Sequence, residues 1–323
     1  MKLHLLILAA APLAFAQSTV TTYTTDLLNG GQDVTSVSAS TDHTQSQIVQ
    51  SINGQDVPLE QRQERLISQD SNGSVTESIV KRYDGTGQLA STERVVTETH
   101  KTPDGGSSTR STIYRSDING QEQLAERRAV DMSVSGLTTT TNTVVDQPSI
   151  NGTFQTVEKR AEVMTTSADK KSSTTTESIY RNGSDGGFRE ASRRVTTQVE
   201  KANQTVVDTT DYEPGVNAGA LQFQERRIST EVSAPDGSHA TTVDVYAPSA
   251  DGHVQDADSP PQLKQQQFIT RVAGPSGVIE TFSIREPSVS EANHLGPLRQ
   301  INQVVCTGNC ATGAPVVEAP PKQ

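Results

Sequence analysis

The sequence predicts an all-β protein: a repetitive antiparallel β-hairpin array that forms an open, twisted or coiled meander of long strands. Three observations support this fold class. Short apolar pairs recur along the chain at a mean spacing of about 34 residues, and a cluster of turn-forming residues follows each of them. The segments between turns are rich in Thr, Ser and Val, which favour a half-solvated pleated sheet. No apolar stripe with helical periodicity is found beyond the N-terminal segment.

The repeat is clearest in two distant stretches that have nearly the same sequence. IYRSDINGQEQLAERRAV (113–130) returns as IYRNGSDGGFREASRRV (179–195). Each unit reads as two strands and two turns, and about eight such units span 17–298. The apolar pairs that define the units are Ile48-Val49, Ile79-Val80, Ile113-Tyr114, Val144-Val145, Ile179-Tyr180 and Val245-Tyr246, with Tyr212 and Ile284 in two weaker positions.

The turns carry Asn-Gly and Asp-Gly dipeptides, as in SDING (116–120), PSING (148–152) and PDGG (103–106). These dipeptides favour positive φ, which tight hairpins require. Four short strands in each unit would give a β-propeller of seven or eight blades instead. Because a blade usually needs about 40 residues or more, the meander is preferred and the propeller is the alternative.

A single unit cannot bury enough apolar surface to offset the entropy of ordering it, so units must stack on their neighbours. The two ends of such an array need protection from edge-to-edge aggregation. Gln17–Asp42 and the irregular unit Pro260–Leu298 are the predicted caps. The remaining segment, 299–323, is expected to hold a cysteine pair and a Pro-rich disordered tail.

One turn carries a family resemblance. Tyr83-Asp84-Gly85-Thr86-Gly87-Gln88-Leu89 resembles the Y-D-x-x-G-x-L signature of YD-repeat proteins. Their hairpins coil into β-sheet shells, often on secreted or surface proteins. Only this instance matches fully, and the period here is longer than in that family. The resemblance implies β-hairpin repeats and does not extend to an encapsulation role.

The N-terminus, MKLHLLILAAAPLAFAQ, has a basic residue, a short apolar run and the Ala14-Phe15-Ala16 cleavage pattern. We therefore expect a signal peptide over 1–16, cleaved after Ala16, and a secreted or periplasmic mature chain. The net charge of −11 and the interspersed basic residues argue against nucleic acid as a partner. No transmembrane segment is expected in the mature chain, because its strands lack both apolar alternation and aromatic girdles.

No motif indicates catalysis, so the chain is expected not to be an enzyme, and no cofactor or metal is predicted. Cys306 and Cys310 are the only cysteines. In an exported protein this pair most simply forms a disulfide, although short-spaced thiols can also bind soft metals. Scattered histidines show no ligand spacing. The sequence leaves the partner unknown, with extracellular polysaccharide or protein as candidates.

Basic pairs recur after the turns, at Arg127-Arg128, Arg193-Arg194 and Arg226-Arg227. Neighbouring residues on a strand point to opposite faces, so each pair should place one Arg on each face of the sheet. An Arg ladder along one face could bind an anionic polysaccharide. The favoured function is an exported, non-enzymatic repeat protein with a structural or surface-binding role. The alternative is a carbohydrate-binding or carbohydrate-active propeller.

Overall fold

The computed structural model describes residues 19–26, 32–40, 42–52, 55–117, 119–183, 185–215, 220–248, 261–274, 277–288 and 295–308. Within these ranges the chain forms one antiparallel sheet of eighteen strands. The strands are Thr19–Asp26 (β1), Gln32–Ala39 (β2), His43–Ile52 (β3), Gln55–Gln69 (β4), Gly73–Tyr83 (β5), Leu89–Lys101 (β6), Ser107–Ser116 (β7), Glu122–Ser135 (β8), Thr138–Pro148 (β9), Phe154–Thr166 (β10), Ser172–Asn182 (β11), Phe188–Lys201 (β12), Gln204–Pro214 (β13), Leu221–Ser233 (β14), His239–Ala247 (β15), Gln262–Gly274 (β16), Gly277–Arg285 (β17) and Arg299–Gly308 (β18).

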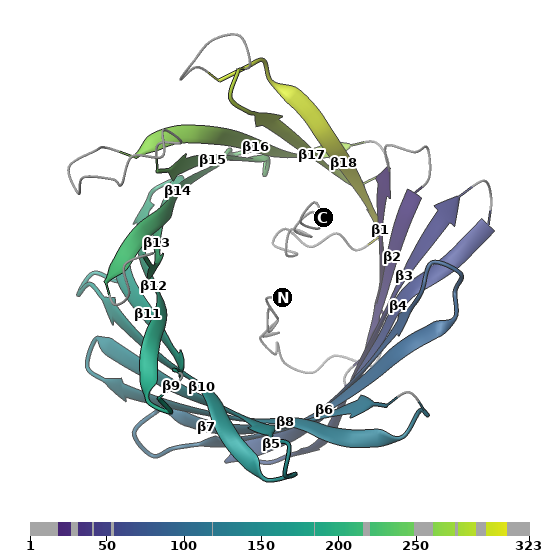
Figure 1. The fold of residues 1–323 in the computed structure, drawn as a ribbon. Helices are drawn as coiled ribbons and strands as arrows, with labels where there is room; N and C mark the ends of the chain where they lie inside the picture. Colours follow the sequence, from purple (N-terminus) through teal and green to yellow (C-terminus); the bar gives the residue numbers. More distant parts are fainter. Residues whose placement is uncertain are drawn as a thin grey trace.

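The sheet closes on itself. Every strand pairs with the next one along the chain, and β1 pairs with β18 as well as with β2. Across this seam Thr22 lies opposite Thr307 and Thr24 lies opposite Val305. Viewed along its axis the molecule is a ring of strands (Figure 1). The all-β, antiparallel prediction is confirmed, but the open meander and the propeller are both wrong, because closure pairs the two edges that an open array would leave exposed.

The predicted caps are wrong for the same reason. Described residues of Gln17–Asp42 form the β1–β2 hairpin, and those of Pro260–Leu298 form β16 and β17, all of which are ordinary members of the sheet. The predicted boundary at Leu298 is also misplaced, since Arg299–Gly308 forms β18. The signal peptide over 1–16 and the tail beyond residue 308 lie outside the described residues and remain predictions.

The hairpin turns repeat one hydrogen-bonding pattern. In the turn after β7, the Gly120 amide donates to the Asp117 carbonyl at 2.9 Å, and the Asp117 carboxylate accepts from the amides of Asn119 and Gln121. Gly120 has a φ of 77°, as expected for a glycine that follows a type I turn and forms a bulge. The positive φ predicted from Asn-Gly is therefore confirmed, and it falls on the glycine.

Four of the six repeated apolar pairs coincide with irregularities in the strand register. The register shifts between Ile113 and Tyr114 where β7 meets β8, and between Ile179 and Tyr180 where β11 meets β12. A bulge adds twist and bends the strand that carries it. Because such shifts recur from hairpin to hairpin, they supply the curvature that a closed barrel needs.

The apolar core is a thin layer and not a filled interior. Among the described residues no side chain is fully buried, and the most buried apolar residues are 4–9% exposed. Apart from Cys306, they are Val80, Ile113, Val145, Val245 and Val304. The first four belong to the repeated apolar pairs, so the sequence repeat marks the core. Barrels of about 16–18 strands leave an aqueous lumen, which agrees with this sparse burial.

Candidate functional site: the ion-lined inner wall

The register separates the side chains of the barrel wall into an inner and an outer set. All six of the most buried apolar residues fall on one face when the pairings are followed from strand to strand. On the other face Val163, Val232 and Val272 are 39–45% exposed. Side chains converge on the concave side of a cylinder and shield one another, so the buried face is the inner one.

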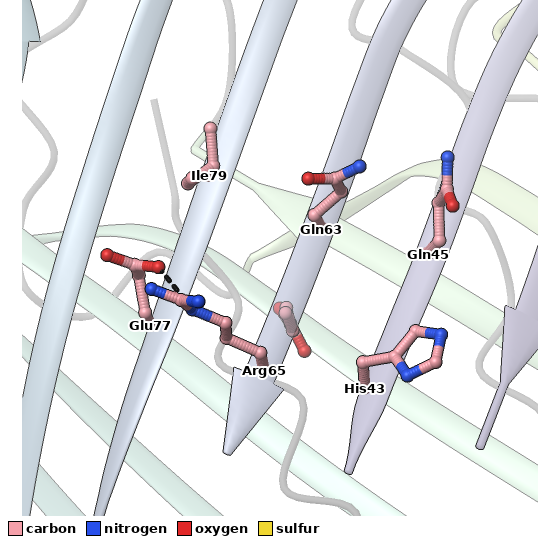
Figure 2. Close-up of a pocket in the computed structure, with 7 residues that line it drawn as sticks. His43, Gln45, Gln63, Arg65, Glu77 and Ile79 are labelled. Carbon is pink, nitrogen blue, oxygen red and sulfur yellow. Dashed lines mark hydrogen bonds and ion pairs between the residues drawn. The ribbon is translucent and has the colours of Figure 1, made fainter. Parts of the chain in front are cut away.

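Figure 2 agrees with this assignment. His43, Gln45, Gln63, Arg65, Glu77 and Ile79 project toward the viewer from β3–β5, and strands of the opposite wall lie behind them. These six side chains therefore belong to the outer face. They line a shallow hollow of about 460 Å³. Arg65 Nε donates to Glu77 Oε2 at 2.6 Å, and Arg94 Nη1 lies 3.5 Å from Glu77 Oε1, so this buried carboxylate has two guanidinium neighbours.

On the inner wall, several strands carry a glutamate and an arginine two residues apart. Alternation places both on the same face, where they pair. Arg128 Nη2 donates to Glu126 Oε1 at 2.7 Å, and Arg160 Nε donates to Glu158 Oε1 at 2.6 Å. Arg227 Nε donates to Glu225 in the same way. These pairs form a lattice of charges around the lumen.

Two inner carboxylates are each shared by two arginines. Glu158 accepts from Arg160 and also from Arg181 Nε at 3.1 Å, across the β10–β11 pairing. Glu60 lies 3.3 Å from Arg82 Nε and 3.7 Å from Arg62 Nη2. A second glutamate lies near one arginine of each cluster: Arg62 Nη1 is 3.8 Å from Glu64 Oε1, and Arg160 Nη1 is 4.0 Å from Glu177 Oε1. Each cluster therefore holds two guanidinium groups and two carboxylates.

The charge lattice lies over the thin apolar layer. Ile113 is opposite Glu126 across the β7–β8 pairing, and Val145 is flanked by Arg128 on β8 and Glu158 on β10. Glu126 is 6% exposed, and it also accepts from Gln147 Nε2 at 3.2 Å. Ile113 and Val145 thus lie beside the stems and head groups of neighbouring ion pairs, as long charged side chains allow.

The outer wall is also polar. Arg110 Nη1 donates to Asp131 Oδ1 at 3.0 Å, and both residues are at least half exposed. Arg226 Nη2 donates to Asp208 Oδ2 at 2.6 Å. Arg127 stacks over the Phe154 ring at 4.4 Å. The outer wall therefore departs from the continuous apolar band, about 25 Å tall, that lipid-facing barrels carry.

The predicted basic pairs behave as expected. Arg127 pairs with Thr112 on the outer face, while Arg128 pairs with Ser111 on the inner face. The prediction that each pair places one Arg on each face is confirmed. Each face of the wall therefore carries one arginine of each pair, and on the inner face Arg128 is paired with Glu126. Sequence reasoning missed the inner carboxylate partners of these arginines. The Glu-x-Arg pattern at 126–128, 158–160 and 225–227 could have identified them, because it places both side chains on one face of a strand.

The cysteine prediction falls only partly on described residues. Cys306 lies on β18, facing inward and 5% exposed, whereas Cys310 lies outside the described residues. The disulfide remains a prediction, to be tested by mass spectrometry without reduction. In the described ranges no group of three or more His, Cys, Asp or Glu residues could hold a metal ion.

Comparisons with known proteins give one informative likeness. No family model and no curated protein matches the chain. A crystal structure of Pseudomonas aeruginosa OccK2 (OpdF), determined in complex with glucuronate, aligns with a TM-score of 0.54 and 9% identity over 90% of this chain and 97% of that one. At this identity the likeness concerns the fold alone. No helix in the described ranges is long and apolar enough to cross a membrane.

These findings overturn the function expected from the sequence. A repeat protein that binds through open sheet faces, and a propeller that binds or cleaves carbohydrate, both require an architecture other than a closed barrel. What the chain shares with OccK2 is a barrel fold with strands along nearly its whole length.

Proposed function

We propose that the protein is a non-enzymatic conduit for small, charged, polar solutes, with the ion-lined inner wall as the surface that they contact. The observation that carries this proposal is the closed wall of eighteen strands whose inner face bears paired carboxylates and guanidinium groups. A barrel that enclosed a dry core would place apolar side chains at these positions. The fold likeness to OccK2, which was determined in complex with glucuronate, is consistent with the proposal.

Small solutes suit this wall better than a large apolar ligand. Pockets for drug-sized ligands are mostly apolar with a few polar groups. The inner wall has the reverse composition, since arginines and glutamates such as Arg115, Glu93 and Arg160 stand above a thin aliphatic layer. Hydrated ions and small charged molecules can exchange water for these groups at little cost, which favours passage over tight retention.

The test is solute flux through purified, reconstituted protein. In a background with both native cysteines replaced by serine, a single cysteine is placed at Ser111 or at Thr112. These neighbours on β7 face the lumen and the outside respectively, because Ser111 pairs with the inward Arg128 and Thr112 with the outward Arg127. Because the outer wall carries exposed ion pairs such as Arg110–Asp131, flotation first establishes that the protein is bound to the membrane. Inserted protein should then give discrete conductance steps in planar bilayers. A bulky, charged thiol reagent should reduce the conductance only when the cysteine is at position 111.

Two results would contradict the proposal. One is reconstituted protein, shown by flotation to be bound to the vesicles, that conducts no ions. The other is equal block by the reagent from positions 111 and 112, which would mean that the conducting path does not run along the inner face.

A further inference from the structure

Several inner arginines are held in one particular way, through the Nε edge of the guanidinium group. Arg115 Nε donates to Glu93 Oε2 at 2.9 Å, Arg181 Nε donates to Glu158 Oε2 at 3.1 Å, and Arg160 Nε donates to Glu158 Oε1 at 2.6 Å. The glutamates belong to the wall and are only 12–14% exposed. Each therefore acts as a fixed anchor that sets the direction of its arginine.

Anchoring through Nε leaves the other edge of the guanidinium, formed by Nη1 and Nη2, directed away from the anchor. The side chains of Arg115, Arg160 and Arg181 are 51%, 42% and 63% exposed. Within the described part of the chain, no recorded hydrogen bond uses the Nη atoms of Arg115 or Arg181. Arg160 Nη1 lies 4.0 Å from Glu177 Oε1.

A guanidinium edge with two parallel N–H groups matches the two oxygens of a carboxylate or a phosphate. Because the wall glutamate already fixes the side chain, less rotamer entropy is lost when an anion binds. At the Glu158 cluster, Arg160 and Arg181 bring two such guanidinium groups to one anchoring carboxylate.

The inner wall also contains a feature that opposes anions. Glu162 and Glu177 lie directly opposite each other across the β10–β11 pairing, on the inner face. They would attract cations. Glu177 is within 4.0 Å of Arg160, which offsets part of its charge, whereas Arg181 projects from the same strand pair with most of its surface exposed. The attraction for an anion near Glu158 therefore rests on the Nη edge of Arg181 and not on a net positive charge.

From this geometry we infer that the lumen binds small carboxylate- or phosphate-bearing anions, on the Nη edges of arginines whose Nε atoms are anchored to wall glutamates. Arg160 and Arg181 form the principal anion-binding site, and Arg115 forms a second one. This inference names a solute class for the proposed conduit and rests on the same inner wall. The inference concerns the binding of anions, so it can be tested separately from the conduction of solutes.

Binding is measured first, on folded protein at low ionic strength, by calorimetric titration with inorganic phosphate and with acetate. The double variant Arg160→Gln, Arg181→Gln should weaken phosphate binding by about tenfold or more, since a hydrogen bond to a charged group contributes roughly that factor. The variant Arg160→Lys, Arg181→Lys keeps the charge but removes the two parallel N–H groups of each guanidinium. It should bind phosphate more tightly than the Gln double variant and more weakly than the wild type, which shows whether geometry matters beyond charge.

Arg65→Gln is the matched control. Arg65 is anchored through Nε to Glu77 at 2.6 Å, with 65% of its side chain exposed, but it lies on the outer wall (Figure 2). We expect its substitution to leave the lumenal affinity for phosphate unchanged. Circular dichroism of each variant establishes that the sheet is intact.

Reversal potentials in planar bilayers then separate the two proposals. If the wild-type lumen favours chloride over potassium and the Gln double variant loses that preference, both stand. If phosphate binds in an Arg160- and Arg181-dependent manner but no conductance is observed, the conduit fails and the anion-binding site remains. Phosphate affinity that is unaltered in the Gln double variant, or reduced equally by Arg65→Gln, overturns the inference.

Discussion

The thin inner layer of aliphatic side chains should respond strongly to truncation at Ile113. This residue is 4% exposed and lies between Val95 on β6 and Glu126 on β8. Replacing a buried Ile with Ala usually costs about 2–5 kcal/mol in unfolding free energy. No described side chain is fully buried, so water from the lumen can enter the space left behind. We therefore expect Ile113→Ala to cost about 2 kcal/mol, at the lower end of that range.

The assay is equilibrium unfolding in urea, followed by far-ultraviolet circular dichroism, with the change in free energy taken from the midpoint and slope. Val163→Ala on the outer wall is the matched control. Val163 is 41% exposed, and its truncation should cost under about 1 kcal/mol. Equal destabilisation by the two substitutions, or none by Ile113→Ala, would refute the assignment of inner and outer faces.

Three other variants probe a turn carboxylate, a turn glycine and the outer wall. The pKa of Asp84 is held below its ordinary value of 3.8, first by the Thr86 hydroxyl and then by turn amides. The resulting stability is present above pH 3.8 and is lost as the pH falls through the lower folded-state pKa. The melting-temperature difference between wild type and Asp84→Asn should therefore shrink in strongly acidic buffer, and a constant difference down to the lowest pH would contradict this. Gly120 has a φ of 77° with nothing within 4 Å of an added Cβ, so Gly120→Ala should cost about 1 kcal/mol through backbone strain alone, as measured by urea unfolding. A neutral result would place the turn in another conformation. Replacing the exposed outer pair Arg110 and Asp131 with Leu should raise the fraction of protein that floats with liposomes, because an arginine at the bilayer midplane costs roughly 2–4 kcal/mol. Unchanged flotation would mean that this part of the wall does not meet lipid.

Local features of the fold were readable from the sequence because they depend on residues close together in the chain. The Asn-Gly and Asp-Gly turns, the strand composition and the hairpin period all follow from short-range preferences. The apolar pairs even marked the core, since Val80, Ile113, Val145 and Val245 are its most buried members apart from β18 residues. Four of the six pairs contribute one buried side chain each, and its neighbour in the pair faces the outer wall.

Closure could not be read in the same way. It depends on β1 meeting β18, two strands from opposite ends of the chain with no shared motif. Strands such as TTTTNTVVDQP (β9) carry polar residues on both faces, so the alternation of side chains did not show which face points into the barrel. A wall with a wet lumen and a polar exterior lacks the apolar contrast on which such predictions depend.

Only part of the inner charge lattice could be predicted from the sequence. The arginine pairs stood out, and their division between two faces is a direct consequence of strand geometry. The anchors did not stand out, because Glu60 meets Arg82 and Glu158 meets Arg181 only through the register between neighbouring strands. Sequence separation of more than twenty residues hides such pairs until the hairpin is built.

The seam between the first and last strands provides the most direct test of the closed barrel. With Cys306 and Cys310 replaced by serine, cysteines are placed at Thr24 and Val305, which lie opposite each other across the β1–β18 pairing. A second variant pairs Thr24 with Val34 across the β1–β2 hairpin. Directly opposed residues on antiparallel strands are close enough for a disulfide. After mild oxidation and peptide mapping, a closed barrel predicts that both pairs cross-link to similar extents. Cross-linking of the hairpin pair alone would show that the sheet is open, and the lumen with its ion-lined wall would not exist.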